Sequence, residues 1–163
     1  MKPAIAAAEG SDTDLDSLAR QHGVEDGWSC VKPFEVRWDD IDAFGHVNHR
    51  THLLWCEEAR NHYFRELGEF PFGIDRPGPV IREVSFSYDR PLGLEDSVLV
   101  AAKVDWIRST SFRMAFSVWS HGIVGRGSAI CIWMRNDSGS RVPLPDSLRA
   151  LILAKDNATD ARN

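Results

Sequence analysis

The sequence predicts an α+β fold in which one long helix packs on a single antiparallel sheet. Three observations lead to this prediction. Apolar residues recur at helical spacing in residues 50–67, apolar and polar residues alternate in several later segments, and short connections join those segments. Strands that are joined so tightly pair as antiparallel hairpins. The helix therefore has one continuous sheet to cover.

The first part of the predicted domain consists of one strand and the long helix. Residues 34–38 alternate as a half-buried strand does. The helix over residues 50–67 has Asn48 as a suitable N-cap and Gly68 as a suitable stop. One face of this helix is apolar and partly aromatic: Trp55, Ala59, Tyr63 and Leu67, widened by His52, Cys56 and Phe64. A face of this size predicts a helix that the sheet covers well.

Four further strands follow a loop rich in proline and glycine at residues 69–79. Period-two alternation predicts them over residues 80–88, 98–106, 112–118 and 124–135. Two glycines, Gly125 and Gly127, share one face of the last strand and would allow a helix to approach closely there. A short terminal helix begins at residues 144–148, with Pro145 in its first turn.

The ends of the chain are expected to lie outside the packed domain. Residues 1–30 hold two basic and six acidic side chains, which predicts an acidic and mobile N-terminal arm. Within it, residues 14–22 form at most a short helix with a small apolar face. Residues 31–155 are predicted to form a single domain, and residues 156–163 to fray as a C-terminal tail.

Composition and charge argue against several classes of function. The chain has 163 residues, a net charge of −5 and 43% hydrophobic residues, which is typical of one soluble globular domain. Because most of the net negative charge lies in the N-terminal arm, the near-neutral remainder argues against nucleic acid as a partner. No apolar run approaches the ~18–20 residues of a membrane span, and residues 1–8 are too weakly apolar for a signal peptide. We therefore expect a cytoplasmic protein without a membrane partner.

The three cysteines, Cys30, Cys56 and Cys131, form neither a disulfide framework nor a zinc pattern. Cys56 and Cys131 lie in apolar surroundings, which predicts buried and inert thiols.

Residues 39–49 carry the densest group of chemically active side chains. This segment holds three aspartates and two histidines between a predicted strand and the start of the long helix. A helix start offers free backbone N–H groups and the positive end of the helix dipole. A carboxylate or imidazole beside it could act as nucleophile or base next to a preformed oxyanion site.

The same segment resembles the acyl-CoA thioesterases of the hot-dog fold. The core Asp-x-Asp-x-x-Gly-His-Val-Asn lies at residues 40–48, and the resemblance runs from about residue 34 to 151. More narrowly, the sequence resembles the 4-hydroxybenzoyl-CoA thioesterase-like branch, and it is also similar to plant acyl-ACP thioesterases. The resemblance implies a long central helix wrapped by a five- to six-stranded antiparallel sheet. It also implies hydrolysis of an acyl-CoA or acyl-ACP without a cofactor or a metal.

The resemblance assigns roles by position. The catalytic carboxylate falls on Asp42, as nucleophile or general base, although a turn acid that binds loop N–H groups is the alternative. His46 would orient Asp42 or a water or protonate the leaving thiolate, or it is a turn histidine. Asn48 would position water or simply cap the helix. The backbone N–H of His49 would stabilise the oxyanion, and Gly45 would let the chain pass close to the substrate.

Two further residues are candidates for substrate binding. His52 stands where many relatives have an aromatic residue, so the wall of the acyl pocket is expected to be more polar here. Arg108, beside the hairpin at residues 109–110, is the candidate for the CoA phosphates, or else an ordinary surface arginine. Because relatives build the site across a dimer interface, the resemblance implies a dimer at least and leaves a tetramer open.

Four alternatives to this assignment remain open. Another hot-dog branch takes its acid from the long helix, where Glu57 or Glu58 could serve, although such pairs are more often solvated or ion-paired. A metal site of His46, His49, His52 and Asp42 lacks a complete ligand set. A hot-dog hydratase or dehydratase would carry an Asn-Pro dipeptide between its aspartate and histidine, which is missing here. A non-catalytic acyl-thioester binding module would have the same fold and pocket.

Overall fold

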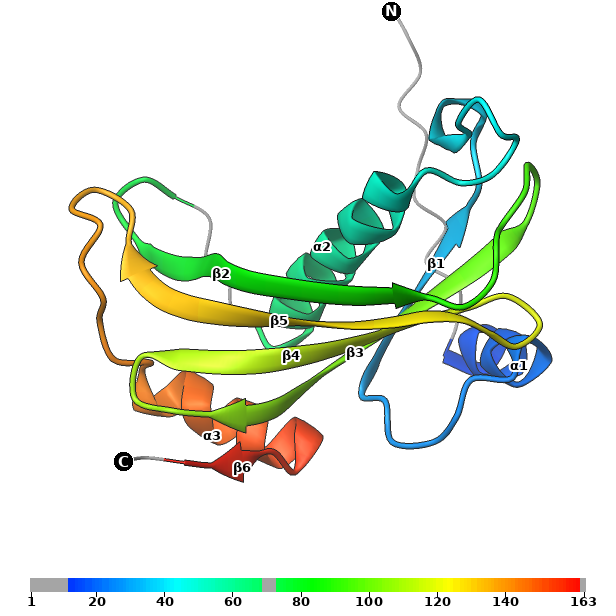
Figure 1. Cartoon of the computed structure of the whole chain (residues 1–163). Helices are drawn as coiled ribbons and strands as arrows, with labels where there is room; N and C mark the ends of the chain where they lie inside the picture. Colours follow the sequence, from blue (N-terminus) through cyan, green and yellow to red (C-terminus); the bar gives the residue numbers. More distant parts are fainter. Residues whose placement is uncertain (1–11, 69–72, 162–163) are drawn as a thin grey trace, which may run out of the picture.

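A curved antiparallel sheet wraps the long helix α2 (His49–Glu66), as the sequence predicted (Figure 1). The computed structural model describes residues 12–68 and 73–161. The five longer strands lie side by side in the order β1-β3-β4-β5-β2. Their bounds are β1 (Cys30–Glu35), β2 (Pro77–Tyr88), β3 (Ser97–Ile107), β4 (Ser111–Trp119) and β5 (Ile123–Arg135).

Four shorter elements complete the described residues: helix α1 (Asp12–His22), the 3-10 helix η1 (Trp38–Asp40), helix α3 (Asp146–Asp156) and the short strand β6 (Thr159–Asp160). Strand β6 runs parallel to β3, and every other strand pair is antiparallel. Among these elements no helix is both long and apolar enough to cross a membrane.

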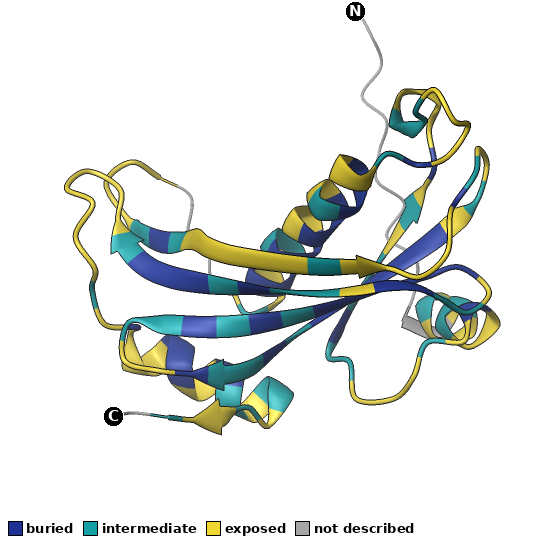
Figure 2. Cartoon of the chain, viewed as in Figure 1, coloured by how far each residue is buried: buried dark blue, intermediate teal, exposed yellow. Residues whose placement is uncertain are grey.

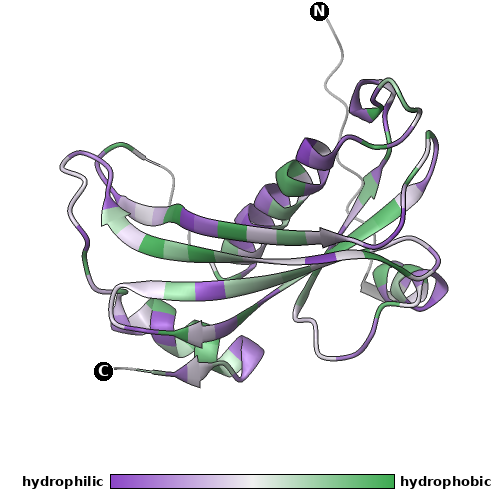
Figure 3. Cartoon of the chain, in the orientation of Figure 1, coloured by the Kyte–Doolittle hydropathy of each residue, from purple (hydrophilic) through white to green (hydrophobic). Residues whose placement is uncertain are grey.

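The main core lies between α2 and the concave face of the sheet. Tyr63 and Phe64 of α2 are completely buried there, against Phe112 and Met114 of β4. Figure 2 shows that β3, β4 and β5 are buried along much of their length, whereas β2 is largely exposed. Figure 3 shows that β2 nevertheless alternates between hydrophobic and hydrophilic residues. This edge strand therefore presents apolar side chains to solvent.

Helix α1 packs on the other side of the sheet. Leu15, Leu18 and Ala19 of this helix lie against Leu99 and Trp119 in a second, smaller apolar cluster. The buried His22 accepts a hydrogen bond from the backbone N–H of His121 at 3.2 Å. From residue 12 onward the segment is thus packed rather than the mobile arm that its charge predicted, because Leu15, Leu18 and Ala19 cover an apolar strip on this side of the sheet. Residues 1–11 lie outside the described residues.

The C-terminal segment is also held in place. Asp156 accepts hydrogen bonds from the Tyr63 hydroxyl and the Val104 backbone N–H, both at 2.6 Å, and Asp160 pairs with Arg149 at 2.7 Å. The sequence predicted fraying from residue 156 because chain ends are often poorly ordered, and no local pattern indicates the distant partners Tyr63 and Val104. Residues 162 and 163 lie outside the described residues.

Three smaller expectations also differ. The first strand lies at Cys30–Glu35 rather than 34–38, because its partner β3 begins at Ser97 opposite Glu35. Pro145 is the N-cap of α3 and not part of its first turn. The sequence predicted that a helix packs closely on Gly125 and Gly127, but a side chain occupies that space.

These two glycines of β5 accommodate the ring of Phe86 from β2. A β-carbon at residue 125 would lie 2.6 Å from that ring, and one at residue 127 would overlap it. Phe86 pairs with Gly127 in the register of the two strands. The two glycines of β5 therefore make room for the Phe86 ring against the sheet.

Candidate functional site

The segment between η1 and α2 forms a compact loop at the start of the central helix. Ile41 and Val47 form an antiparallel bridge, and the Asp42 N–H donates to the His46 carbonyl oxygen at 2.8 Å. The Gly45 N–H donates to the Asp42 carbonyl oxygen at 3.0 Å, and Gly45 has a φ of +77°. Glycine suits this left-handed conformation, so its role here is to close the loop.

The two oxygens of the Asp42 carboxylate have different surroundings. Oδ1 accepts the backbone N–H of Phe44 at 2.8 Å and that of His46 at 3.4 Å. Oδ2 has no partner among the described residues. The turn role that the sequence left open is therefore real, but it engages only one oxygen. The loop holds the carboxylate in place and leaves the other oxygen available.

The start of α2 leaves one backbone donor available. Asn48 caps the helix: its Oδ1 accepts the Arg50 N–H at 3.1 Å, and its carbonyl oxygen accepts the Thr51 N–H at 2.9 Å. The predicted cap is confirmed. Within the described chain the His49 N–H has no acceptor, as expected for the first residue of a helix. This free donor lies at the positive end of the helix dipole.

The neighbouring polar residues of the loop are structural or exposed. Asp40 accepts the Arg37 N–H at 2.8 Å with its side chain and the Asn48 N–H at 2.8 Å with its carbonyl oxygen. The side chains of Asp39 and His46 are exposed. Asp40 thus shapes the loop, and His46 is free to meet a ligand from solvent.

His52, one turn into α2, is 3% exposed and lies among aromatic rings. Its ring centre lies 5.4 Å from that of Trp55, 5.7 Å from Phe86 and 5.3 Å from Tyr88. Burial, with a smaller effect of nearby His49, lowers the pKa of His52 to about 4. Its Nδ1 has no hydrogen-bond partner in the described structure. At neutral pH His52 is therefore an uncharged imidazole with one unused polar atom.

Tyr88 links the edge strand to the helix start, a contact that no sequence pattern indicated. Its hydroxyl donates to the His49 carbonyl oxygen at 3.4 Å. The only sequence signal was its place at the end of an alternating strand, which says nothing of the partner. The contact places the end of β2 beside the free His49 N–H.

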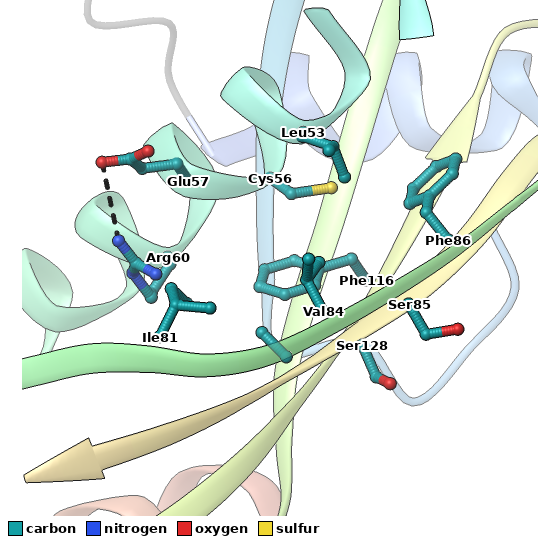
Figure 4. Close-up of a pocket in the computed structure, with 11 residues that line it drawn as sticks. Leu53, Cys56, Glu57, Arg60, Ile81, Val84, Ser85, Phe86, Phe116 and Ser128 are labelled. Atoms are coloured by element: carbon teal, nitrogen blue, oxygen red, sulfur yellow. Dashed lines mark ion pairs between the residues drawn. The ribbon is translucent and has the colours of Figure 1, made fainter. Parts of the chain in front are cut away.

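An apolar pocket of about 140 Å³ continues along α2 from this point (Figure 4). It lies between the helix and strands β2, β4 and β5. Phe86 lines the pocket and also contacts His52, so the helix start and the pocket adjoin. The loop, the helix start and the pocket thus form one continuous region.

The family model of the thioesterase-like superfamily matches residues 36–152, which include this whole region. The chain belongs to the thioesterase-like superfamily. The loop at residues 40–48, the long helix α2 and strands β2 to β5 are all within the matched range, and β1 lies directly before it.

Individual relatives agree with membership in this superfamily. A Bacillus subtilis protein with the provisional name of an acyl-CoA thioesterase is 31% identical over 72 residues, which cover 42% of this chain and 51% of that protein. The 1,4-dihydroxy-2-naphthoyl-CoA hydrolase of Synechococcus sp. is 27% identical, covering 73% of this chain and 97% of that protein. The crystal structure of a thioesterase superfamily protein from Jannaschia sp. CCS1 is 28% identical with a TM-score of 0.80, covering 89% of this chain and 94% of that one.

Arg108 lies far from the Asp42 loop. It follows β3, whereas the Asp42 loop adjoins the start of β3 through the Val36 N–H, which donates to the Asp96 carbonyl oxygen at 3.1 Å. A strand of this length separates its ends by roughly 30 Å. Arg108 instead lies over the Trp106 ring at 4.9 Å. Within one chain Arg108 therefore lies far from Asp42, and its role toward the CoA phosphates stays a prediction.

The two helix glutamates are ion-paired, as expected for a charged helix surface. Glu58 lies 3.2 Å from the Lys32 ammonium, and Glu57 lies 3.6 Å from the Arg60 guanidinium. All three cysteines are free and buried, and burial raises the pKa of Cys56 to about 12 and that of Cys131 to about 11. Cys56 and Cys131 are therefore buried as predicted, and their thiols are protonated at neutral pH.

The histidines proposed as metal ligands do not converge. Among the described residues, one group has three ligand atoms within 4.8 Å of one another, namely Cys30, His62 and Glu66. Its carboxylate is already paired with His62 at 3.1 Å and with Lys155 at 3.0 Å. The Lys155 charge opposes a cation at that position.

Proposed function

We propose that this chain hydrolyses acyl-CoA thioesters to a free acid and CoA thiol. The observation that carries the proposal is the combination of a free Asp42 oxygen and a free His49 N–H at one helix start, in a chain of the thioesterase-like superfamily. Two relatives have names that specify CoA thioesters, which favours CoA over an acyl carrier protein.

Asp42 can act in either of two ways. As a nucleophile, Oδ2 attacks the thioester carbon, the C–S bond breaks, and the thiolate leaves with a proton from His46 or water. Water then cleaves the mixed anhydride and regenerates the carboxylate. As a general base, Asp42 takes a proton from water, hydroxide forms the bond to carbon, and that proton passes to the thiolate. Both routes need Oδ2 to be free, while Oδ1 is held by the loop.

The His49 N–H serves the developing oxyanion in both routes. A donor aimed at the oxyanion, in a site that excludes water, contributes ~3 kcal/mol of transition-state stabilisation. Asn48 supports this donor indirectly, because it satisfies the next two N–H groups and keeps the first turn formed. The neutral, buried His52 would form part of the wall beside the thioester rather than transfer protons.

We further propose that two copies pair along β2. This edge strand has no neighbour on one side within the described chain, and it exposes Val80, Ile81, Val84 and Tyr88 by 40–50%. Long apolar edge strands of this kind pair with other chains unless they are blocked. Because Tyr88 contacts His49, a second copy on β2 would lie next to the proposed site of the first.

The test is a thiol-release assay over aliphatic and aromatic acyl-CoAs and an acyl-ACP. We expect hydrolysis of CoA thioesters, and a loss of at least about a hundredfold in kcat for Asp42→Asn. Asparagine keeps an acceptor for the loop N–H groups, so the fold should persist. The control Asp39→Asn changes an exposed aspartate of the same segment and should keep full activity.

The result also separates the alternatives. Tight binding of acyl-CoA without any thiol release would identify a binding module. Water addition to an enoyl-CoA without thiol release would identify a hydratase. Full activity of Asp42→Asn would contradict the assignment of Asp42.

A further inference from the structure

The apolar pocket beside α2 ends in a buried charge. Near the helix start it is lined by Phe86 and Leu53, and farther along by Cys56 and Ile81 (Figure 4). Arg60 lies at the far end and is only 8% exposed. A cavity of about 140 Å³ is close to the size that holds a benzene ring. Most of the lining is apolar, with Glu57, Ser85 and Ser128 as the other polar residues, and a buried arginine is unusual in such a lining.

The Arg60 guanidinium is only partly satisfied by the protein. One terminal nitrogen lies 3.6 Å from Glu57, whose side chain is 58% exposed, and the group also interacts with the Cys131 thiol. Its Nε is buried and has no hydrogen-bond partner among the described residues. A guanidinium has only donors, so this nitrogen needs an acceptor. A buried donor on a charged group that lacks an acceptor is costly, which points to a ligand oxygen.

Arg60 lies where an acyl group would end if its thioester were bound at His49. At 1.5 Å per residue, Arg60 lies about 16 Å along α2 from His49, the proposed oxyanion donor. The apolar part of the pocket lies between them. Beyond Arg60, Glu57, Asn61 and Asn136 line a wider and more polar opening of about 430 Å³. A ligand that runs along the helix would thus meet a polar end, an apolar middle and a second polar end.

We infer that Arg60 determines the acyl specificity of this site and selects acyl groups with a hydrogen-bond-accepting oxygen at their far end. This inference rests on the proposed function for its assignment of the opposite, reacting end. The Arg60 guanidinium donates to the distal oxygen, and the apolar part of the lining holds the carbons between. Because Glu57 balances the guanidinium charge, a neutral oxygen fits better than a carboxylate.

The experiment compares acyl-CoAs of equal length that end in a methyl, a hydroxyl or a carboxylate group, from six to twelve carbons. We expect the wild type to favour the hydroxyl end over the methyl end by roughly ten- to a hundredfold in kcat/KM. Arg60→Met should remove this preference, so that kcat/KM of the hydroxyl series falls to within about threefold of that of the methyl series in the same variant. Glu57→Gln should shift the preference toward the carboxylate, because it removes the competing negative charge.

The controls keep the test decisive. Arg65→Met, at an exposed arginine of the same helix, should leave the preference unchanged. If Arg60→Met does not fold, Arg60→Lys keeps a cation but moves its donors and should reduce the preference. Thioether analogues of the same three tails, which cannot be hydrolysed, report binding alone by calorimetry.

The two proposals can fail separately. If thioesters are hydrolysed but the tails are not discriminated, the specificity role of Arg60 is wrong and the hydrolase stands. If nothing is hydrolysed but the thioethers show the preference and need Arg60, the hydrolase is wrong and the role of Arg60 stands. If Arg60→Met slows all substrates equally and dissociates a dimer, Arg60 pairs with the second copy, and the inference is overturned.

Discussion

The ring of Phe86 packs on Gly127 of the neighbouring strand, where a side chain would overlap it and come within 2.7 Å of the Ser85 carbonyl oxygen. This contact holds Phe86 between His52 and the pocket along α2. The glycine therefore acts on the site through an aromatic residue of another strand.

Replacing Gly127 by alanine should displace the Phe86 ring. We expect a loss of about 1–3 kcal/mol in unfolding free energy, typical of an overpacked contact, and a higher KM. Urea unfolding and steady-state kinetics measure the two effects. Gly93→Ala is the control, because a β-carbon there meets its nearest atom at an ordinary 3.9 Å. Equal effects of both substitutions would show that Gly127 has no special role.

Asn48 offers a test of capping against water positioning. Asn48→Ala should cost about 1 kcal/mol of stability and reduce kcat, because the first turn of α2 and the His49 N–H lose their support. Asn48→Asp keeps the acceptor and should restore both. Thermal unfolding and thiol release are measured together. If Asn48→Asp is stable but inactive, the side chain has a chemical role beyond the cap.

Asp156 should be one of the most sensitive positions for stability. Asp156→Ala removes the acceptor of the half-buried Ser29 hydroxyl and leaves two buried donors, the Tyr63 hydroxyl and the Val104 N–H, unpaired in the interior. Two such losses amount to about 3 kcal/mol, which urea unfolding can measure. The control Asp137→Ala removes an exposed ion pair with Arg135 and should change little. A small effect at Asp156 would mean that water replaces the carboxylate.

His52 should make stability fall in acid. Its pKa of about 4 in the folded chain lies below the 6.5 of an unfolded chain, so the unfolded state binds more protons between these values. Stability is therefore intact above pH 6.5 and decreases as the pH falls toward 4, by up to about 3 kcal/mol. Urea unfolding of His52→Phe across this range should show a weaker dependence.

Two other histidines must be considered when this pH dependence is measured. Burial also lowers the pKa of His22, which acts in the same direction and remains in the variant. His46→Ala, at an exposed histidine, should keep the wild-type dependence. An unchanged slope in His52→Phe would assign the effect elsewhere.

The proposed pairing along β2 predicts that a charge on this strand prevents assembly. Val84 is 50% exposed near the middle of β2, and Val84→Lys should convert a dimer into monomers in analytical ultracentrifugation. Leu94→Lys alters a similarly exposed residue outside β2 and should leave the assembly intact. A wild-type chain that sediments as a monomer would refute the pairing itself.

The sequence by itself determined the layers of this protein. Period-two alternation and short connections specify β2 to β5, and the spacing of Trp55 and Tyr63 specifies the buried face of α2, because these signals depend only on local geometry. The loop motif at residues 40–48 likewise indicated the carboxylate, the cap and the helix start, which are neighbours along the chain.

Only the tertiary structure decided which distant residues meet. The packing of α1 on Trp119, the anchoring of Asp156 by Tyr63, and the ring of Phe86 over Gly127 join residues that are far apart in sequence or on different strands. The burial of Arg60 at the end of an apolar pocket depends on β2 and β5 as well as on its own helix. No local pattern encodes such contacts, because they arise from the closure of the sheet around the helix.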